Sequence, residues 1–342
     1  MMYIYTLNGR KVDPVALHEA LLSWLRVALG TVNHVRLVCF SNAYRSMFRG
    51  RFIRGASSWL ENWSVASGAR NFCSHSELPM EKSRLVHGVF SSVAPAYDLM
   101  NDCMSLGLHR VWKDHFVRRL RPVSGMRIVD VAAGTGDIAF RIWQREPRVS
   151  LTLLDPNEEM LSIARRRAAA LLGRSRFSDS DHGEELAPGP ATSTRSQPAG
   201  VAGTMRFIVA AAERLPLPDA LFDAYTISFG MRNTSEPLRA MQESYRVLRQ
   251  GGRFLMMEFA RVRETFPLVQ QLYDAYSINV IPWLGERIAR DRHAYEYLVE
   301  SIRAFPDQDE VCAMLERSGF REVTFEDLGF GMVSIYSGWK LE

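Results

Sequence analysis

Apolar runs of strand length alternate with segments of helical periodicity in the middle of the chain. Continuous apolar runs are typical of strands that are buried on both faces of a sheet. They occur in MRIVDVAA (126–133), SLTLLD (150–155), the start of FIVAAAERLP (207–216), FDAYTISFG (222–230) and RFLMMEF (253–259). Because strands joined by crossover helices pair in parallel, the pattern predicts a doubly wound α/β sheet, with ligands beyond the carboxyl ends of the strands.

Three of the intervening segments have the periodicity of amphipathic helices. They are DIAFRIWQR (137–145), NEEMLSIARRRAAALL (157–172) and SEPLRAMQESYRVLRQGG (235–252). The third is expected to end at Gly251, since a glycine there accommodates a left-handed helix end. The apolar stripes of the first and third are Ile138, Ile142 and Trp143, and Leu238, Met241, Tyr245 and Leu248.

Composition narrows the class of protein. With 342 residues and 47% apolar content, the chain can bury one large core. The net charge of +4 is modest and its basic residues are dispersed, so no nucleic-acid partner is indicated. The four cysteines form no CxxC pair, which predicts reduced thiols and no metal site. No apolar run approaches the roughly 18 residues of a spanning helix, so any membrane contact is expected to be peripheral.

Residues 1–80 differ from the rest of the chain and are predicted to form a disordered leader. Residues 20–60 contain no acidic side chain, while six arginines alternate with Ser, Leu, Phe and Trp, as in mitochondrial transit segments. The most typical part, MFRGRFIRGASSW, begins at Met47, which favours Met47 as the true start. A basic accessory domain is the alternative. A second irregular segment, 173–203, is rich in Ser, Pro, Gly and Ala and is predicted to be a disordered insertion within a domain at 82–342.

Residues that could bind a ligand lie at the predicted strand ends. Gly134 and Gly136 would let a ligand approach the backbone closely, and Asp155 is placed to accept hydrogen bonds from ribose hydroxyls. The pattern predicts an adenosine site. Together with Ala139 the glycines also satisfy the GxGxxG/A fingerprint, so a nicotinamide-dependent oxidoreductase is an alternative. However, no second pyrophosphate-binding turn follows, and the downstream order of elements resembles class I S-adenosylmethionine-dependent methyltransferases.

The motifs extend this resemblance to one family. VFSSVAPAYDLMNDCMSLGLHRVWKD (89–114), DVAAGTGDIAFR, AERLPLPDALFDAYTISFGMRN and SYRVLRQGGRFLMMEF together resemble the UbiE family, the C-methyltransferases of ubiquinone and menaquinone synthesis. The likeness covers residues 82–341 apart from the insertion. It implies a seven-stranded, mostly parallel sheet with a reversed last strand, and S-adenosyl-L-methionine as cofactor. The implied reaction is methylation of a ring carbon of 2-methoxy-6-polyprenyl-1,4-benzoquinol.

The resemblance also implies site residues. Those at the family's cofactor positions are Gly134, Thr135, Gly136, Asp155, Asn157, Ala211, Ala212 and Ser228. Arg232, Asn233 and Tyr97 fall on proposed catalytic positions. Because a guanidinium keeps its proton up to a pKa above about 12, Arg232 is expected to stabilise a phenolate and fix a water, with Asn233 orienting it. The alternatives are an arginine that points into water and, for the segment around Tyr97, a capped helix start.

Two departures from the family pattern concern the cofactor. Ala133 replaces a glycine, which is tolerable if its backbone torsion is ordinary. Ala211 stands where relatives carry Asp or Asn, and losing one hydrogen bond would cost about 0.5–1.5 kcal/mol of binding free energy. A catalytically weak structural subunit of a quinone-synthesis complex is therefore a further alternative.

The aromatic and apolar segment 265–292 is a candidate for binding the polyprenyl tail, although core packing or a dimer interface explains its composition equally well. The resemblance implies other ubiquinone-biosynthesis proteins as partners in a complex, and a homodimer is expected. It also implies peripheral attachment to the matrix side of the inner mitochondrial membrane.

Overall fold

The structure is a computed structural model that divides the chain into two compact units, Met1–Ser76 and Glu77–Glu342. It describes residues 5–7, 10–12, 86, 88, 101–102, 104–105, 107–172, 203–261, 273, 276–278, 281–282, 285–289 and 291–341. In the first unit these residues form an antiparallel pair, β1 (Tyr5–Leu7) and β2 (Arg10–Val12). Tyr97, most of the predicted leader and all of the predicted insertion except Gly203 lie outside the described residues.

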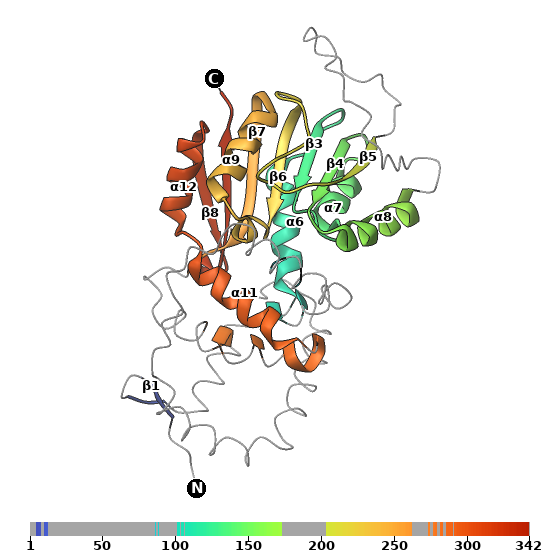
Figure 1. Cartoon of the computed structure of the whole chain (residues 1–342). Helices are drawn as coiled ribbons and strands as arrows, with labels where there is room; N and C mark the ends of the chain where they lie inside the picture. The colour runs from blue at the N-terminus through green and yellow to red at the C-terminus, as the bar shows by residue number, and fades with distance from the viewer. Residues whose placement is uncertain are drawn as a thin grey trace. The chain divides into compact units, whose positions relative to one another are not determined.

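The second unit is built around one mixed sheet (Figure 1). In chain order its main elements are α6 (Leu108–Leu120), β3 (Arg127–Val131), α7 (Asp137–Arg145), β4 (Ser150–Asp155), α8 (Glu158–Leu172), β5 (Thr204–Val209), β6 (Phe222–Ser228), the 3₁₀ helix η3 (Met231–Asn233), α9 (Pro237–Val247), β7 (Leu248–Phe259), the π-helical turn η4 (Gly285–Ala289), α11 (Arg292–Ala304), α12 (Gln308–Arg317), β8 (Arg321–Leu328), the 3₁₀ turn η5 (Gly329–Gly331) and β9 (Val333–Trp339). The strand order is β5-β4-β3-β6-β7-β9-β8. Neighbours from β5 to β7 pair in parallel, and β9 is antiparallel to both of its neighbours. The predicted seven-stranded sheet with a reversed last strand is confirmed.

Helices cover both faces of this sheet. One core joins side chains of α6, α7 and α8 to one set of strand residues, such as Ile128 and Leu255. The other joins α9 and α12 to the alternate set, such as Val129 and Phe254. Because neighbouring residues of a strand point to opposite faces, both sets must be apolar. This double burial explains the continuous apolar runs in the sequence.

The helix stripes and boundaries agree with the sequence pattern in part. Ile138, Ile142 and Trp143 of α7 are buried as predicted. The prediction for the third helix was wrong at its end, because α9 stops at Val247 and Leu248 already belongs to β7. Backbone pairing accounts for the difference: the Gly251 amide donates to the Lys340 carbonyl at 2.7 Å.

The stripe predicted on this helix is also partly wrong. Leu238 is 36% exposed, whereas the buried face consists of Ala240, Met241, Ser244 and Val247. Pro237 occupies the first turn, so the helix begins just before Leu238. The buried residues lie mainly in the later turns, which pack on the second core.

A small cluster lies apart from the two main cores. Ile281 packs with Ala294, Tyr295 and Val299 of α11, and Met104, Tyr276 and Leu298 border them. The Tyr276 hydroxyl donates to the Met104 carbonyl at 3.0 Å. We call this set the apolar cap; α11 crosses below the ends of β6 and β7 in Figure 1. Within the part of the chain described, no helix is long and apolar enough to span a membrane.

Candidate active site

The turn between β3 and α7 is shaped by its glycines and by one carboxylate. Gly134 and Gly136 have φ values of 55° and 82°, in the region that favours glycine. A Cβ on Gly136 would meet the Phe140 ring at 2.6 Å. Asp155, at the end of β4, accepts the Gly134 N–H through Oδ2 at 2.8 Å and the Asn157 N–H through Oδ1 at 2.8 Å. The acid predicted to hold ribose therefore also braces the glycine turn.

Thr135 and Asn157 are buried beside this turn. Arg167 of α8 donates Nη1–H bonds to both the carbonyl and the hydroxyl of Thr135, at 3.0 Å each. Its guanidinium also lies over the Phe140 ring, 5.1 Å from the centroid. Asn157 accepts the Met160 N–H at 3.1 Å and so caps the start of α8. Both residues hold α8 against the turn.

The remaining predicted cofactor residues have different surroundings. Ala212 is buried in the second core, and Ala211 is exposed. The Ser228 hydroxyl, at the end of β6, is buried without a hydrogen-bond partner among the described residues. Such an orphaned polar atom is costly, at about 1–3 kcal/mol, and fits a site that a polar ligand completes. Ala133 has no left-handed torsion, so its replacement of glycine meets the condition for tolerance.

Arg232 and Asn233 lie in η3, directly after β6. The Arg232 side chain is buried, and its Nη1 lies 2.7 Å from Oε1 of Glu258, whose side chain is fully buried. The Arg232 N–H also donates to Glu258 Oε2 at 3.2 Å, and the guanidinium covers the Phe259 ring at 5.1 Å. The alternative of an arginine that points into water is therefore wrong. Asn233 Oδ1 accepts the Tyr297 hydroxyl of α11 at 3.3 Å.

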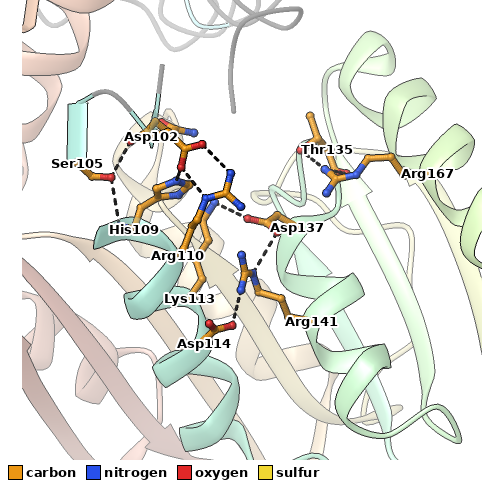
Figure 2. A network of polar contacts seen from close by, with 11 residues as sticks. Asp102, Ser105, His109, Arg110, Lys113, Asp114, Thr135, Asp137, Arg141 and Arg167 are labelled. Carbon is orange, nitrogen blue, oxygen red and sulfur yellow. Dashed lines mark hydrogen bonds and ion pairs between the residues drawn. The ribbon is translucent and has the colours of Figure 1, made fainter. Parts of the chain in front are cut away.

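A polar network joins the start of α6 to the first residue of α7 (Figure 2). Lys113, which is buried, donates to Asp137 Oδ2 at 2.8 Å, and Arg141 donates to Asp137 Oδ1 at 3.1 Å. Asp137 follows Gly136 directly. At the other end of the network His109 Nε2 lies 2.8 Å from Asp102 Oδ1. The residues of this network fall within the family motifs of the sequence. Only the i, i+4 spacing of His109 and Lys113 indicates in advance that two of them share one helix face.

Burial and neighbouring charges set the protonation states of three groups. Hydrogen bonds from the Arg110 guanidinium lower the pKa of Asp102 to about 2. Burial lowers the pKa of His109, and the Lys113 cation lowers it further. Burial raises the pKa of Asp130, in the β3 strand, to about 7, although the Thr226 hydroxyl donates to its Oδ1 at 2.7 Å. Among the described residues, no group of three or more His, Cys, Asp or Glu side chains could hold a metal ion.

The fold and site define a class I S-adenosylmethionine-dependent methyltransferase. Doubly wound dinucleotide-binding folds keep the strand order 3-2-1-4-5-6, all parallel. Here the antiparallel β9 is inserted between β7 and β8, which is the methyltransferase arrangement. The glycine turn, the acid at the end of the neighbouring strand and the Ser228 hydroxyl, which has no partner among the described residues, lie at the carboxyl ends of the parallel strands. Ligands of doubly wound sheets bind at these ends.

The chain belongs to the ubiE/COQ5 methyltransferase family, whose model matches residues 78–175 and 191–340. It is 43% identical to the Drosophila melanogaster 2-methoxy-6-polyprenyl-1,4-benzoquinol methylase, mitochondrial, over 84% of this chain and 90% of that protein. Identity to the Bos taurus protein of the same name is 46%, over 76% of this chain and 80% of the relative. It is 43% identical to the ubiquinone/menaquinone biosynthesis C-methyltransferase UbiE of Roseobacter denitrificans, over 76% and 92% of the two chains.

A solved structure of an S-adenosylmethionine-dependent methyltransferase from Thermotoga maritima aligns with 75% of this chain and 99% of its own, at 19% identity and a TM-score of 0.46. Family membership confirms the predicted methyltransferase activity, with S-adenosyl-L-methionine as the cofactor. The assignment of individual site residues stays a prediction.

Proposed function

We propose that the protein methylates a ring carbon of 2-methoxy-6-polyprenyl-1,4-benzoquinol in mitochondrial ubiquinone biosynthesis. The names of the Drosophila and Bos taurus relatives support this substrate and this compartment. One structural observation carries the proposal. A glycine turn braced by Asp155 lies at the carboxyl ends of the strands. The polar network that begins at Asp137, beside this turn, ends at Asp102, which precedes Met104 of the apolar cap by two residues. A polar cofactor and a lipid-like substrate need such adjoining surfaces.

Each candidate site residue has its own role in the proposed reaction. Bound S-adenosylmethionine supplies an electrophilic methyl group to an electron-rich carbon. Gly134, where an added Cβ would meet no other described atom within 4 Å, would leave room for it, and Asp155 has oxygen lone pairs for ribose hydroxyls. The Ser228 hydroxyl, which has no hydrogen-bond partner among the described residues, would add a polar contact. Arg232 is neutralised by Glu258 and would act chiefly by fixing the turn that carries Asn233. Asn233 links that turn to Tyr297 of α11, where it can orient the ring.

The first part of the polyprenyl tail is proposed to lie against the partly buried members of the apolar cap, which are Met104, Tyr276 and Leu298. Because the residues of the cap belong to α11 and to the segments around Met104 and Tyr276, the tail would leave the site between them. A substrate that resides in a bilayer requires contact with that bilayer, so we place the enzyme on the matrix side of the inner membrane as a peripheral protein. A homodimer and a complex with other ubiquinone-biosynthesis proteins belong to the same proposal. Carbonate extraction of mitochondria should release the protein, and retention in the membrane pellet would contradict peripheral attachment.

Calorimetric titration tests the cofactor site. S-adenosylmethionine and S-adenosylhomocysteine should bind, and NADH should not. Asp155→Asn should weaken binding roughly 10- to 100-fold, because hydrogen bonds to a charged group contribute about 1.5–3 kcal/mol. Asp223→Asn is the matched control, since Asp223 lies near the amino end of β6, away from the carboxyl ends of the strands, and accepts hydrogen bonds from Arg249 and the Arg127 amide. Equal losses in both variants would contradict a ribose contact.

Methylation of a short-chain 2-methoxy-6-polyprenyl-1,4-benzoquinol, followed by mass spectrometry, then tests the reaction. The expected product is heavier by one methylene unit and forms only with S-adenosylmethionine. Cofactor binding without turnover would support the structural-subunit alternative. Binding of NADH in place of S-adenosylmethionine would overturn the proposal altogether.

A further inference from the structure

His109 belongs to a polar network that runs from Asp102, two residues before Met104 of the apolar cap, to Asp137, directly after Gly136 of the cofactor turn (Figure 2). It lies in the first turn of α6. Lys113, one turn further along the helix, donates a hydrogen bond to Asp137, the residue that follows Gly136. On its other side, the chain before α6 includes Met104 of the apolar cap. Figure 2 shows the His109 ring between Asp102 and Lys113 at this end of the helix. A ring bound between cofactor and cap would therefore lie near His109.

The hydrogen bonds of His109 define its tautomer. Arg110 holds Asp102 through Nε and Nη2, both at 2.6 Å, and the low pKa of Asp102 keeps that carboxylate ionised. An ionised carboxylate only accepts, so His109 Nε2 carries the hydrogen that it donates to Asp102 at 2.8 Å. The lone pair then lies on Nδ1. This pair has the geometry of a base oriented by an acid.

The second ring nitrogen, Nδ1, carries no hydrogen in this tautomer. It is buried and without a hydrogen bond among the described residues, on a side chain that is 8% exposed. Leaving a buried acceptor unpaired costs about 1–3 kcal/mol, so such atoms in folded proteins call for a functional explanation. A hydroxyl donated by a bound ligand would satisfy it.

The charged groups around the ring keep it neutral. Burial lowers the pKa of His109, and Lys113 on the same helix lowers it further. Asp102 and Asp137, the latter from α7, act in the opposite direction without reversing the shift. Arg110 is neutralised by Asp102. At pH 7 the imidazole can accordingly accept a proton.

Other described candidates for a base are paired with another side chain, buried inside the sheet or exposed to solvent. Arg232 and Glu258 are paired with each other, and a guanidinium has donors only. His115 pairs with Glu326, and the His293 side chain is 96% exposed. Asp130 is buried inside the sheet, where its Oδ1 accepts the Thr226 hydroxyl at 2.7 Å.

We infer that His109 Nδ1 is the general base that takes the proton from a ring hydroxyl of the quinol, and that Asp102 positions it. The inference rests on the proposed function. The O–H bond breaks, its proton goes to Nδ1, and its electron pair moves into the ring. The neighbouring ring carbon bonds to the methyl group as the C–S bond breaks, and sulfur keeps that electron pair. The ring C–H proton then passes to water, the imidazolium returns its proton to the oxygen, and one proton is released per methyl transferred.

The pH dependence of kcat/KM tests this role. Wild-type activity should fall as the pH drops through the pKa of His109. His109→Gln should lower kcat about 10²- to 10⁴-fold and abolish this acid limb, because general-base catalysis contributes factors of that size. Its dissociation constant for S-adenosylmethionine should stay within twofold of wild type. His115→Gln, on the same helix, is the matched control and should keep both rate and profile. Asp102→Asn should move the acid limb to lower pH, since a carboxylate that raises the pKa is removed.

Nuclear magnetic resonance of histidine-labelled protein gives a readout independent of turnover. His109 should appear as the Nε2–H tautomer at pH 7, and a quinol analogue that cannot be methylated should shift its Nδ1 signal. A His109→Gln variant within threefold of wild type across the pH range would overturn the inference. So would a loss caused by weaker cofactor binding with the acid limb retained. Failure of the wild-type enzyme to methylate the quinol would instead contradict the proposed function.

Discussion

Ionisable side chains in and beside the sheet are compensated in different ways. Arg232 and Glu258 neutralise each other, as do Lys113 and Asp137. Asp130 has no ion pair with a cation among the described residues, and burial raises its pKa to about 7. Each arrangement removes the free-energy cost of an isolated charge in a low-dielectric interior. Each therefore responds differently when one group is changed.

Removing Arg232 should destabilise the fold as well as the active site. Arg232→Met leaves the fully buried Glu258 without its cation, which typically costs about 3–5 kcal/mol of unfolding free energy. Arg232→Met combined with Glu258→Gln removes both charges and should recover at least half of that loss. Urea unfolding followed by circular dichroism measures both values.

The same pair of variants separates folding from catalysis. If the double variant is stable but inactive, Arg232 has a role in the reaction besides its ion pair. A single variant within about 1 kcal/mol of wild type would show that Glu258 finds another partner or a proton. That result would contradict the expected structural role of the pair.

Asp130 should make stability depend on pH. Its folded-state pKa of about 7 exceeds the ordinary value of 3.8, so the folded state binds the proton more tightly than the unfolded state. The stability from this group is complete below pH 3.8 and is lost as the pH rises through 7. The slope within this window is about 1.4 kcal/mol per pH unit.

Asp130→Asn, which mimics the protonated acid, should abolish this slope. The difference in unfolding free energy between variant and wild type should grow in favour of the variant by about 2–3 kcal/mol from pH 5 to pH 7. Chemical denaturation at the two pH values measures it. A constant difference would show that Asp130 is ionised throughout.

Local sequence features predicted residue positions better than residue partners. The glycines of the turn and Asp155 could be placed, because a glycine run and an acid both follow apolar strands. Glu258, 26 positions after Arg232, could not be paired with it, since that contact depends on two strands ending side by side. The chemistry of His109 could not be predicted either, because its burial and its pairing with Asp102 arise only in the folded chain.

The ends of β3 and β6 approach each other unusually closely. A Cβ on Gly230 would lie 2.4 Å from the Cβ of Ala132. Ala132 and Phe229 have φ values of 52° and 55°, which are unfavourable for residues with side chains. The turns after β3 and β6 can approach this closely only because residue 230 has no side chain. The positive φ values indicate that some backbone strain is retained there.

Gly230→Ala should reveal this contact. The added methyl group should cost about 1–3 kcal/mol of unfolding free energy by overpacking. Ala132→Gly removes the opposing methyl group, so the double variant should be more stable than the sum of the single effects by about 1 kcal/mol or more. A double-mutant cycle by urea unfolding gives this coupling energy. Strict additivity would mean that the turns relax apart.

Element boundaries followed the sequence where local signals and tertiary pairing agreed. The start and end of α7 and β4 coincide with the predicted segments. The end of α9 does not, because LRQGG pairs with the last residues of the chain and leaves the helix early. Sequence periodicity contains no information about that distant partner.

At the scale of the molecule, the alternation of strands and helices was enough to predict a parallel doubly wound sheet. The position of β9 between β7 and β8 could be expected only from the family resemblance. Local patterns specify which residues form a strand, whereas the order of strands depends on long-range burial. The cap around α11 was predicted only as an apolar composition.

The family match passes over residues 176–190, and this gap leads to a prediction about the whole molecule. Helix α8 ends at Leu172, and the Gly203 amide is already bonded to the Pro147 carbonyl at 3.1 Å before β5 begins. A connection between a helix and the next strand needs only about 2–6 residues. Replacing residues 176–190 by a four-residue Gly-Ser linker should therefore leave cofactor affinity unchanged. The unfolding free energy should change by less than about 0.5 kcal/mol, since loop entropy varies slowly with length. Calorimetry and urea unfolding measure the two quantities. A loss of cofactor binding would show instead that this segment contributes to the active site.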